Sequence, residues 1–385
     1  MITWLIKIGE LALKGGNRKT FEDILKRNLR RMLGGTEAGI ETKIGRFYVH
    51  SDDENAAHIE QVLDHLIGIA GWARTRICAK TPEAVIRSCI DEAREWNSPG
   101  IKTFKIEARR TDKSFPLDSY ALCTEAGDAV LRTVPGLSVN VHNPDCTISI
   151  EIREKSYIYP NSRRGVGGLP VGSAGRGLLL LSGGIDSPVA GFRMACRGMG
   201  IDAVHFHSYP YTSAEARQKV IDLAHILSSY CITIGLHIIG FTEVQKRIKE
   251  RTPESWATVL LRMAMMDCAE RIALRKKNKC LITGESLSQV ASQTIENIRC
   301  TESGISLPVL RPLIGDDKEN ITRLAEKIGT YKTSILPYAD CCVLFSPAHP
   351  VLHGDVAEAR ELYAKLEIEN LMTDALNNEE MIIAN

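Results

Sequence analysis

The sequence predicts a protein of the α/β class, with a doubly wound parallel sheet in its C-terminal half and smaller α+β units before it. After residue 175, short apolar strand-like runs alternate with segments of helical period. Before residue 165, strands and helices mix in an order typical of ferredoxin-like units. A glycine-rich stretch, residues 165–172, separates the two patterns and predicts a linker.

The composition is ordinary for a globular protein, but the charge is unevenly placed. The 385 residues are 44% hydrophobic and 25% charged, with a net charge of +1. Residues 1–50 hold ten Lys and Arg against five Asp and Glu, whereas residues 341–385 hold two against eight. A basic front half can approach a polyanion. No signal peptide or long apolar span is evident, so we expect a cytoplasmic protein without a membrane partner.

The eleven cysteines are irregularly spaced and contain no C-x-x-C pair. This spacing disfavours a disulfide framework and a zinc ribbon, and it agrees with a reducing compartment. Most of them stand in mixed apolar contexts and are expected to be inert core residues. This group comprises Cys78, Cys89, Cys123, Cys146, Cys196 and Cys231.

The first unit is predicted from a strand at 2–8, a helix at 19–32, a strand near 46–50 and a helix near 55–66. This β-α-β-α order suggests a ferredoxin-like unit. One face of the first helix carries Lys26, Arg27, Arg30 and Arg31. That face either binds a polyanion or is simply a solvated basic surface.

The second unit begins near residue 77. Helices are predicted at 83–96 and 119–134 and strands at 103–108 and 147–154, with a basic loop at 109–116. We therefore place the domains at 1–75, 76–170 and 171–385.

The C-terminal domain shows the strand–helix alternation of a parallel sheet. Strands are predicted at 178–182, 203–207, 234–239 and 280–283, and helices at 187–198, 214–229, 255–276 and 318–328. Ligands of such sheets bind beyond the C-terminal strand ends. Residues 182–187, 205–207 and 283–285 all fall at such ends.

The turn Ser182-Gly183-Gly184-Ile185-Asp186-Ser187 stands between an apolar strand and a helix. Such a turn points backbone N–H groups and a helix N-terminus at one spot, which favours phosphate. It is not a Walker A loop, because the chain contains no Gly-Lys pair. The hydroxyls of Ser182 and Ser187 can donate to phosphate. Asp186 either acts on magnesium or the β and γ phosphates, or caps the helix.

This turn resembles the PP-loop of ATP pyrophosphatases, and the chain as a whole resembles the tRNA 4-thiouridine synthetases. Three more stretches carry the second resemblance: 9–18, 283–294 and the segment 335–342 that ends in Cys341-Cys342. The matches run from residue 9 to about residue 350 in family order. The resemblance implies ferredoxin-like, THUMP and PP-loop domains. It also implies ATP- and Mg²⁺-dependent conversion of a tRNA uridine to 4-thiouridine, through an adenylated uridine and a cysteine persulfide.

The resemblance implies a set of ATP contacts around the turn. The turn itself would hold pyrophosphate through Ser182, Gly183, Gly184 and Ser187, and no dedicated protein metal site is predicted. Asp186 and Lys318 are both expected to be catalytic, and Lys318 would neutralise developing phosphate charge, although it could be an exposed lysine at a helix start. Arg262 would meet a phosphate or extend to solvent. The remaining implied contacts are Leu180, Leu181, His205, Phe206, Gly284 and Gln293.

Sulfur transfer needs a thiolate. Cys342 aligns with the family cysteine, and Cys341 is a bystander or a resolving thiol. Some relatives append a rhodanese-like domain, but only about 40 residues follow Cys342 here. We therefore expect sulfur directly from a cysteine desulfurase, or a second thiol at Cys341 or another cysteine. An iron–sulfur cluster built from Cys268 with Cys341 and Cys342 is a further alternative.

The expected partners are tRNA, a cysteine desulfurase, a thiamine sulfur-carrier protein and a second copy of the chain. The RNA would be contacted mainly at its phosphates, by shape rather than sequence. The candidate residues are Lys14, Arg18, Lys26, Arg30, Arg109, Arg110, Lys113, Arg163 and Arg164.

Four other functions compete with tRNA 4-thiolation. Another PP-loop enzyme, such as a 2-thiouridine or lysidine synthetase, would not explain residues 9–18 and 284–294. A non-catalytic RNA-binding protein would not need an intact turn, Lys318 and Cys342. A role in thiamine biosynthesis cannot be separated from thiolation by sequence. A hydrolase is disfavoured, because Gly284-Glu285-Ser286-Leu287-Ser288 lacks the second glycine of a nucleophile elbow.

Overall fold

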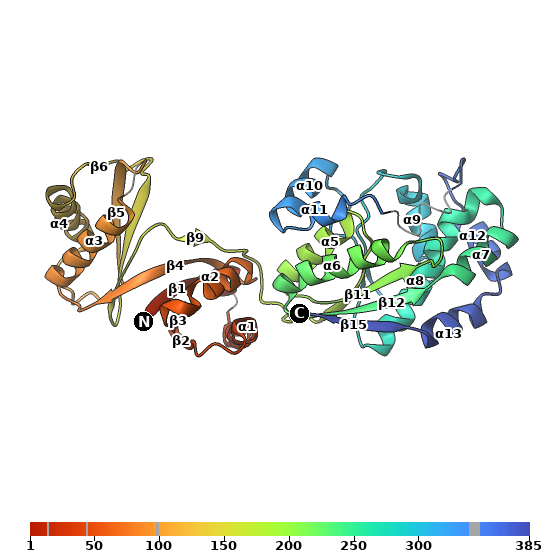
Figure 1. Ribbon diagram of the computed structural model, residues 1–385, viewed down its shortest axis with the longest axis horizontal. Helices are drawn as coiled ribbons and strands as arrows, with labels where there is room; N and C mark the ends of the chain where they lie inside the picture. The colour runs from red at the N-terminus through yellow and green to blue at the C-terminus, as the bar shows by residue number, and fades with distance from the viewer. Residues whose placement is uncertain (14, 44, 98–99, 339–346) are drawn as a thin grey trace. The chain divides into compact units, whose positions relative to one another are not determined.

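The computed structural model describes residues 1–13, 15–43, 45–97, 100–338 and 347–385, which form two compact units, 1–168 and 169–385 (Figure 1). Lys14, Cys341 and Cys342, which the sequence singles out, lie outside the described residues. Among the described helices, none is long and apolar enough to cross a membrane.

The first unit is built on one nine-stranded sheet, ordered β2-β3-β1-β4-β8-β7-β5-β6, with β9 beside β4. The strands are β1 Ile2–Ile8, β2 Gly39–Lys43, β3 Arg46–Ser51, β4 Ile69–Cys78, β5 Thr103–Arg110, β6 Ser138–Val139, β7 Cys146–Ile152, β8 Ser156–Tyr159 and β9 Arg163–Arg164. The helices are α1 Arg18–Leu33, α2 Ala56–His65, α3 Pro82–Trp96 and α4 Ser119–Thr133.

Two apolar cores stabilise this unit. Trp4, Phe47 and Leu25 belong to the core beneath α1 and α2, and Phe104 and Ile148 to the core beneath α3 and α4. The long strand β4 belongs to both halves of the sheet: residues 69–75 pair with β1, and residues 76–78 pair with β8. The predicted boundary between residues 75 and 76 therefore falls inside a continuous strand.

A buried carboxylate also joins the two halves of the first unit. Glu151 of β7 accepts hydrogen bonds from Arg46 Nη2 at 2.7 Å, Arg153 Nε at 2.8 Å and the Tyr159 hydroxyl at 2.8 Å. Burial alone would raise the pKa of Glu151, but the two guanidiniums and the phenol hold it at about 2. Glu151 therefore stays ionised and fixes β3 against β7.

The second unit contains a six-stranded sheet ordered β14-β13-β10-β11-β12-β15, parallel except for antiparallel β15. Its strands are β10 Arg176–Leu180, β11 Gly200–His207, β12 Ile234–Gly240, β13 Leu281–Ile282, β14 Val309–Leu310 and β15 Glu380–Ala384. Its helices are α5 Asp186–Cys196, α6 Ala214–Cys231, α7 Thr242–Arg251, α8 Ala257–Arg275, α9 Ile295–Glu302, α10 Lys318–Lys327, α11 Tyr331–Ser334, α12 Val356–Lys365 and α13 Glu369–Asn377.

The strand order confirms the predicted doubly wound sheet. β11 and β12 follow on one side of β10, and β13 and β14 lie on its other side. The chain thus reverses direction across β10, and a crevice is expected at the carboxyl ends of the strands there. Leu178 and Leu179 of β10 are fully buried, as an inner parallel strand requires.

Two local predictions need correction. Arg109 and Arg110, predicted in a loop, end strand β5 because their backbones pair with Glu151 and Ile152 of β7. The start of the predicted linker is also structured, since Gly167 N donates to Ile69 O at 2.9 Å. The glycines suit this position because a Cβ at Gly165 would come within 2.5 Å of the Ile69 carbonyl oxygen.

Candidate active site

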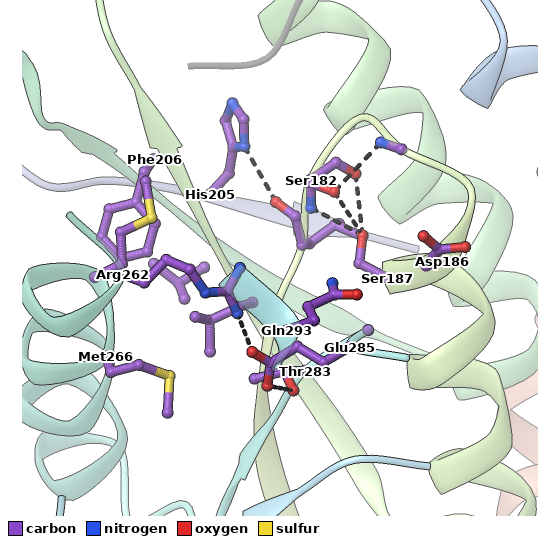
Figure 2. A pocket seen from close by; sticks show the side chains of 16 residues that line it. Ser182, Asp186, Ser187, His205, Phe206, Arg262, Met266, Thr283, Glu285 and Gln293 are labelled. Atoms are coloured by element: carbon purple, nitrogen blue, oxygen red, sulfur yellow. Dashed lines mark hydrogen bonds and ion pairs between the residues drawn. The ribbon is translucent and has the colours of Figure 1, made fainter. Parts of the chain in front are cut away.

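The serine–glycine turn connects β10 to α5 and is closed by its own hydroxyls. Ser182 N donates to Ser187 Oγ at 2.9 Å, the two hydroxyl oxygens lie 3.1 Å apart, and Gly184 N donates to Ser182 Oγ at 3.3 Å (Figure 2). Helix α5 begins without a side-chain cap. Its first N–H groups therefore suit an anionic ligand rather than a capping side chain.

Asp186 is held by two side chains from distant parts of the chain. Its Oδ1 pairs with Lys318 Nζ at 2.5 Å, and its Oδ2 accepts from Gln289 Nε2 at 3.0 Å. The alternative role of Asp186 as a helix cap is wrong, because Ile185 occupies the cap position. Lys318 is half exposed at the start of α10, yet it reaches the turn rather than solvent alone. The structure thus brings the two predicted catalytic residues into contact.

Gly284 lies directly against the start of α5. A Cβ there would meet Ser187 N at 2.7 Å, Ser187 Cα at 2.8 Å and the Asp186 carbonyl carbon at 2.9 Å. Only glycine allows this approach of the segment after β13 to the turn. Gly284 therefore sets the position of the turn as well as lining the pocket beside it.

A pocket opens between the turn, β11, α8 and the segment after β13, as Figure 2 shows. Counted with the solvent at its mouth, it has a volume of about 840 Å³, a size suited to a nucleotide-sized ligand. All predicted ATP contacts except Gly183 line it, together with Asp186. The lining residues are Leu180, Leu181, Ser182, Gly184, Asp186, Ser187, Val204, His205, Phe206, Arg262, Met265, Met266, Thr283, Gly284, Glu285 and Gln293.

The pocket has an apolar wall and isolated polar groups. Phe206, Met265 and Met266 give a surface suited to a flat aromatic base. His205 Nδ1 lies 3.1 Å from Leu181 O, and since a carbonyl oxygen only accepts, Nδ1 donates in this contact. Gln293 is 8% exposed, and its Oε1 has no hydrogen-bond partner in the described part of the chain. Such a buried oxygen suits a ligand N–H group.

Arg262 does not extend to solvent. It reaches from α8 to Glu285, and Arg311 Nε donates to the same carboxylate at 2.7 Å. Burial alone would raise the pKa of Glu285, but these two guanidiniums hold it below its ordinary value. The sequence analysis missed Glu285, Gln289 and Arg311 as site residues, because no local motif shows their contacts with residues 23 to 103 positions away.

The nine described cysteines are poorly suited to sulfur transfer. Burial raises the pKa of every one of these thiols, to about 12 for Cys196, Cys231 and Cys268. In the described ranges, no three His, Cys, Asp or Glu side chains gather as a metal site.

The predicted RNA contacts in the first unit differ in how free they are. Arg30 and Lys113 are exposed. Arg18 Nε pairs with Glu22 at 2.7 Å, and Arg110 Nη1 donates to Phe115 O at 3.0 Å. Arg163 stacks over Trp72 at 4.9 Å and pairs with Asp64 at 3.3 Å. The remaining described candidates are Lys26, half-buried on α1, and Arg109 and Arg164, which are exposed.

Fold and site together define a nucleotide-binding α/β protein of the PP-loop class, preceded by an α+β unit. Family models match residues 3–73 as a ThiI ferredoxin-like domain, 79–159 as a THUMP domain and 172–368 as thiamine biosynthesis protein (ThiI). The chain belongs to the ThiI family.

Two curated relatives match almost the whole chain, and one solved structure matches all of it. The chain is 49% identical over 375 residues to the "Probable tRNA sulfurtransferase" of Treponema pallidum (strain Nichols), covering 97% of this chain and 93% of that one. It is 42% identical to the protein of that name from Alkaliphilus oremlandii, over 97% and 96%. The solved "4-thiouridine synthetase - RNA complex with bound ATP" matches with a TM-score of 0.92, 34% identity and full coverage of both chains.

Proposed function

We propose that this protein is an ATP-dependent tRNA sulfurtransferase that converts a uridine to 4-thiouridine. One observation supports this above the others: Asp186, which pairs with Lys318, stands in a serine–glycine turn that lines a nucleotide-sized pocket. The full-length likeness to a 4-thiouridine synthetase bound to RNA and ATP supports tRNA and ATP as the substrates.

The proposed chemistry makes a poor leaving group into a good one. The uracil O4 attacks the α-phosphorus of ATP, and pyrophosphate leaves. The outer sulfur of the carrier persulfide then attacks C4, and AMP leaves, so that the uridine is joined to the carrier cysteine through an S–S bond. A second thiol attacks the carrier sulfur and breaks that bond, which releases 4-thiouridine and leaves a disulfide that a dithiol reductant returns to two thiols. The protein contributes mostly positioning and charge stabilisation. The backbone of Ser182, Gly183 and Gly184 and the Ser187 hydroxyl hold the departing pyrophosphate.

Asp186 and Lys318 have different proposed roles at the turn. Magnesium bound to a nucleotide usually needs only one or two protein carboxylates, because the phosphates and water supply the rest. Asp186 fits that role, with 20% of its side chain exposed beside the turn. Lys318 then neutralises charge on the transferring phosphate. Phe206 and the backbone of Leu180 and Leu181 frame the adenine, and His205, Arg262, Gly284 and Gln293 complete the ATP site.

We propose Cys342 as the sulfur carrier and a cysteine desulfurase as its donor, with Cys341 as the resolving thiol or a bystander. Two contacts support this proposal by anchoring described residues that precede the pair, the first to the turn and the second to α6. Ser334 Oγ donates to Gly184 O at 3.2 Å, and the buried Lys219 Nζ donates to Leu336 O at 2.9 Å. The raised thiol pKa values of the described cysteines support the assignment further.

The first unit is the proposed tRNA-binding part. Its exposed cations would meet phosphates, so affinity should fall with rising salt. We propose contacts at Lys14, Arg18, Lys26, Arg30, Arg109, Arg110, Lys113, Arg163 and Arg164. A second role in thiamine biosynthesis, with a sulfur-carrier protein, is favoured by the family description. Assembly as a homodimer and residence in the cytoplasm belong to the same proposal.

The deciding experiment is mass spectrometry of tRNA nucleosides from cells that lack the gene. We expect 4-thiouridine to disappear and to return with the wild-type gene. Purified Asp186→Asn protein should bind tRNA normally but form no 4-thiouridine. Persistence of 4-thiouridine in the deleted strain contradicts the proposed function, whereas full activity of Asp186→Asn contradicts only the role of that residue. Growth of the same strain without thiamine tests the second role.

A further inference from the structure

A buried carboxylate beside the pocket has its two oxygens committed to different partners. Glu285 is 3% exposed. Its Oε2 accepts from Arg311 Nε at 2.7 Å and from Thr283 Oγ1 at 2.8 Å, whereas its Oε1 accepts from Arg262 Nη2. One oxygen is therefore anchored to the scaffold, and the other holds an arginine that lines the pocket.

The anchor continues away from the pocket. Arg311 Nη1 pairs with Glu302 Oε2 of α9 at 2.8 Å. Alternating charges thus run from Glu302 through Arg311 and Glu285 to Arg262. A buried charge is costly unless it is paired, and here each inner charge has partners on two sides. The arrangement keeps Glu285 ionised, consistent with its lowered pKa.

Arg262 retains capacity for a ligand. Its Nη2 is used by Glu285, while its buried Nε has no hydrogen-bond partner in the described part of the chain. A free arginine side chain loses rotamer entropy when it is immobilised on a ligand. A side chain that is already fixed loses less, so binding is tighter.

We propose that Glu285 is a positioning residue for ATP: it fixes the guanidinium of Arg262 in the pocket, and Arg311 and Thr283 hold Glu285 itself. The inference rests on the proposed function, because it takes the phosphate chain of ATP as the anion that Arg262 meets. Glu285 lines the pocket, but Arg262, Arg311 and Thr283 already donate to its two oxygens, so it acts on ATP through Arg262.

The test is a double-mutant cycle read by calorimetric titration of the full-length protein with ATP. Glu285→Gln keeps the shape and one acceptor but removes the charge that orients Arg262. We expect the Kd for ATP to rise about tenfold, with kcat at saturating ATP nearly unchanged. Arg262→Ala should weaken ATP binding by a similar factor or more. In the Arg262→Ala background, Glu285→Gln should add no further loss.

Glu369→Gln is the matched control. It also removes a carboxylate paired with an arginine of α8, Arg271, but that carboxylate is 72% exposed and is not among the residues lining the pocket. Its ATP affinity should equal that of wild type. If Glu285→Gln fails to fold, Thr283→Val removes one anchoring hydrogen bond and should raise the Kd about threefold, again only while Arg262 is present.

Four results would overturn the inference. Unchanged affinity in Glu285→Gln would mean that Arg262 needs no orientation. Tighter ATP binding would mean that the carboxylate competes with phosphate for the arginine. If the fold-losses of ATP affinity in the two single variants multiply in the double variant, Glu285 acts independently of Arg262. If Arg262→Ala alone leaves affinity unchanged, the assignment of Arg262 to ATP is wrong, while thiolation itself remains testable through tRNA nucleosides.

Discussion

Replacing Gly284 with alanine should displace the phosphate-binding turn, because the added methyl group meets backbone atoms of the turn as well as the pocket that Gly284 lines. The added Cβ would lie 2.7 Å from Ser187 N, and ordinary contact begins near 3.4 Å, so a displacement of about 0.7 Å is needed. The atoms in the way are backbone and cannot rotate aside. Retreat of β13 is opposed by its pairing with β10 and by the hydrogen bond from Thr283 N to Leu310 O at 3.1 Å.

The magnitude follows from this displacement. Overpacking of this kind costs about 1–3 kcal/mol. For a unit of this size, a loss of about 2 kcal/mol lowers Tm by about 4–8 °C. A shift approaching 1 Å at the turn also misplaces the N–H groups aimed at phosphate, and we expect thiolation to fall about 10- to 100-fold.

The assay is a pair of measurements, thermal unfolding and ATP titration, on Gly284→Ala and on Gly240→Ala. Gly240 also ends a strand of the same sheet, β12, but a Cβ there meets nothing within 4 Å. Gly240→Ala should therefore match wild type in both measurements. Equal Tm and equal ATP affinity for the two variants would refute the argument that Gly284 sets the position of the turn.

Two further predictions concern thiols and pH. Cys342→Ser should stop sulfur transfer while pyrophosphate release continues. Cys268→Ala should retain thiolation, because burial raises the pKa of that thiol to about 12. If Cys341→Ser is inactive and Cys342→Ser is active, Cys341 is the carrier instead. The pKa of Glu151 is held at about 2 in the folded protein, below its ordinary 4.5, so its stabilisation, on the order of 3 kcal/mol, is full above pH 4.5 and is lost as pH falls towards 2. Calorimetry should therefore give wild type a clearly higher Tm than Glu151→Gln at pH 6, and this difference in Tm should shrink below pH 4. A difference in Tm that does not change with pH would count against an ionised Glu151.

The sequence predicts regular amphipathic elements well and edge or polar elements poorly. The strand Ile2–Ile8 is found with the predicted bounds, because its apolar residues fill a core. Strand β2, Gly39–Lys43, escaped prediction because it is a mostly exposed edge strand without an apolar face. Helix α7 escaped because Val244 and Ile248 are its only buried apolar residues.

In the site, features formed by consecutive residues are predictable from the sequence, whereas contacts between distant residues are not. The turn at 182–187 is visible in sequence because six consecutive residues build it. The pairing of Asp186 with Lys318 was expected only as a shared role, since the two are 132 positions apart and only folding shows the contact. In the sequence, Glu285 stands in a segment that resembles an incomplete hydrolase motif. Its ionic partners, Arg262 on α8 and Arg311 next to β14, are evident only from the fold.

The shared strand β4 has a consequence for how the front of the protein behaves as a module. Residues 69–75 and 76–78 of one strand belong to different halves of the sheet, so neither half has a complete edge without the other. Separating them would expose unpaired backbone and cut through the Glu151 contacts. The two N-terminal domains, matched by separate family models, should therefore melt in one cooperative transition and be inherited, exchanged or truncated only as a pair.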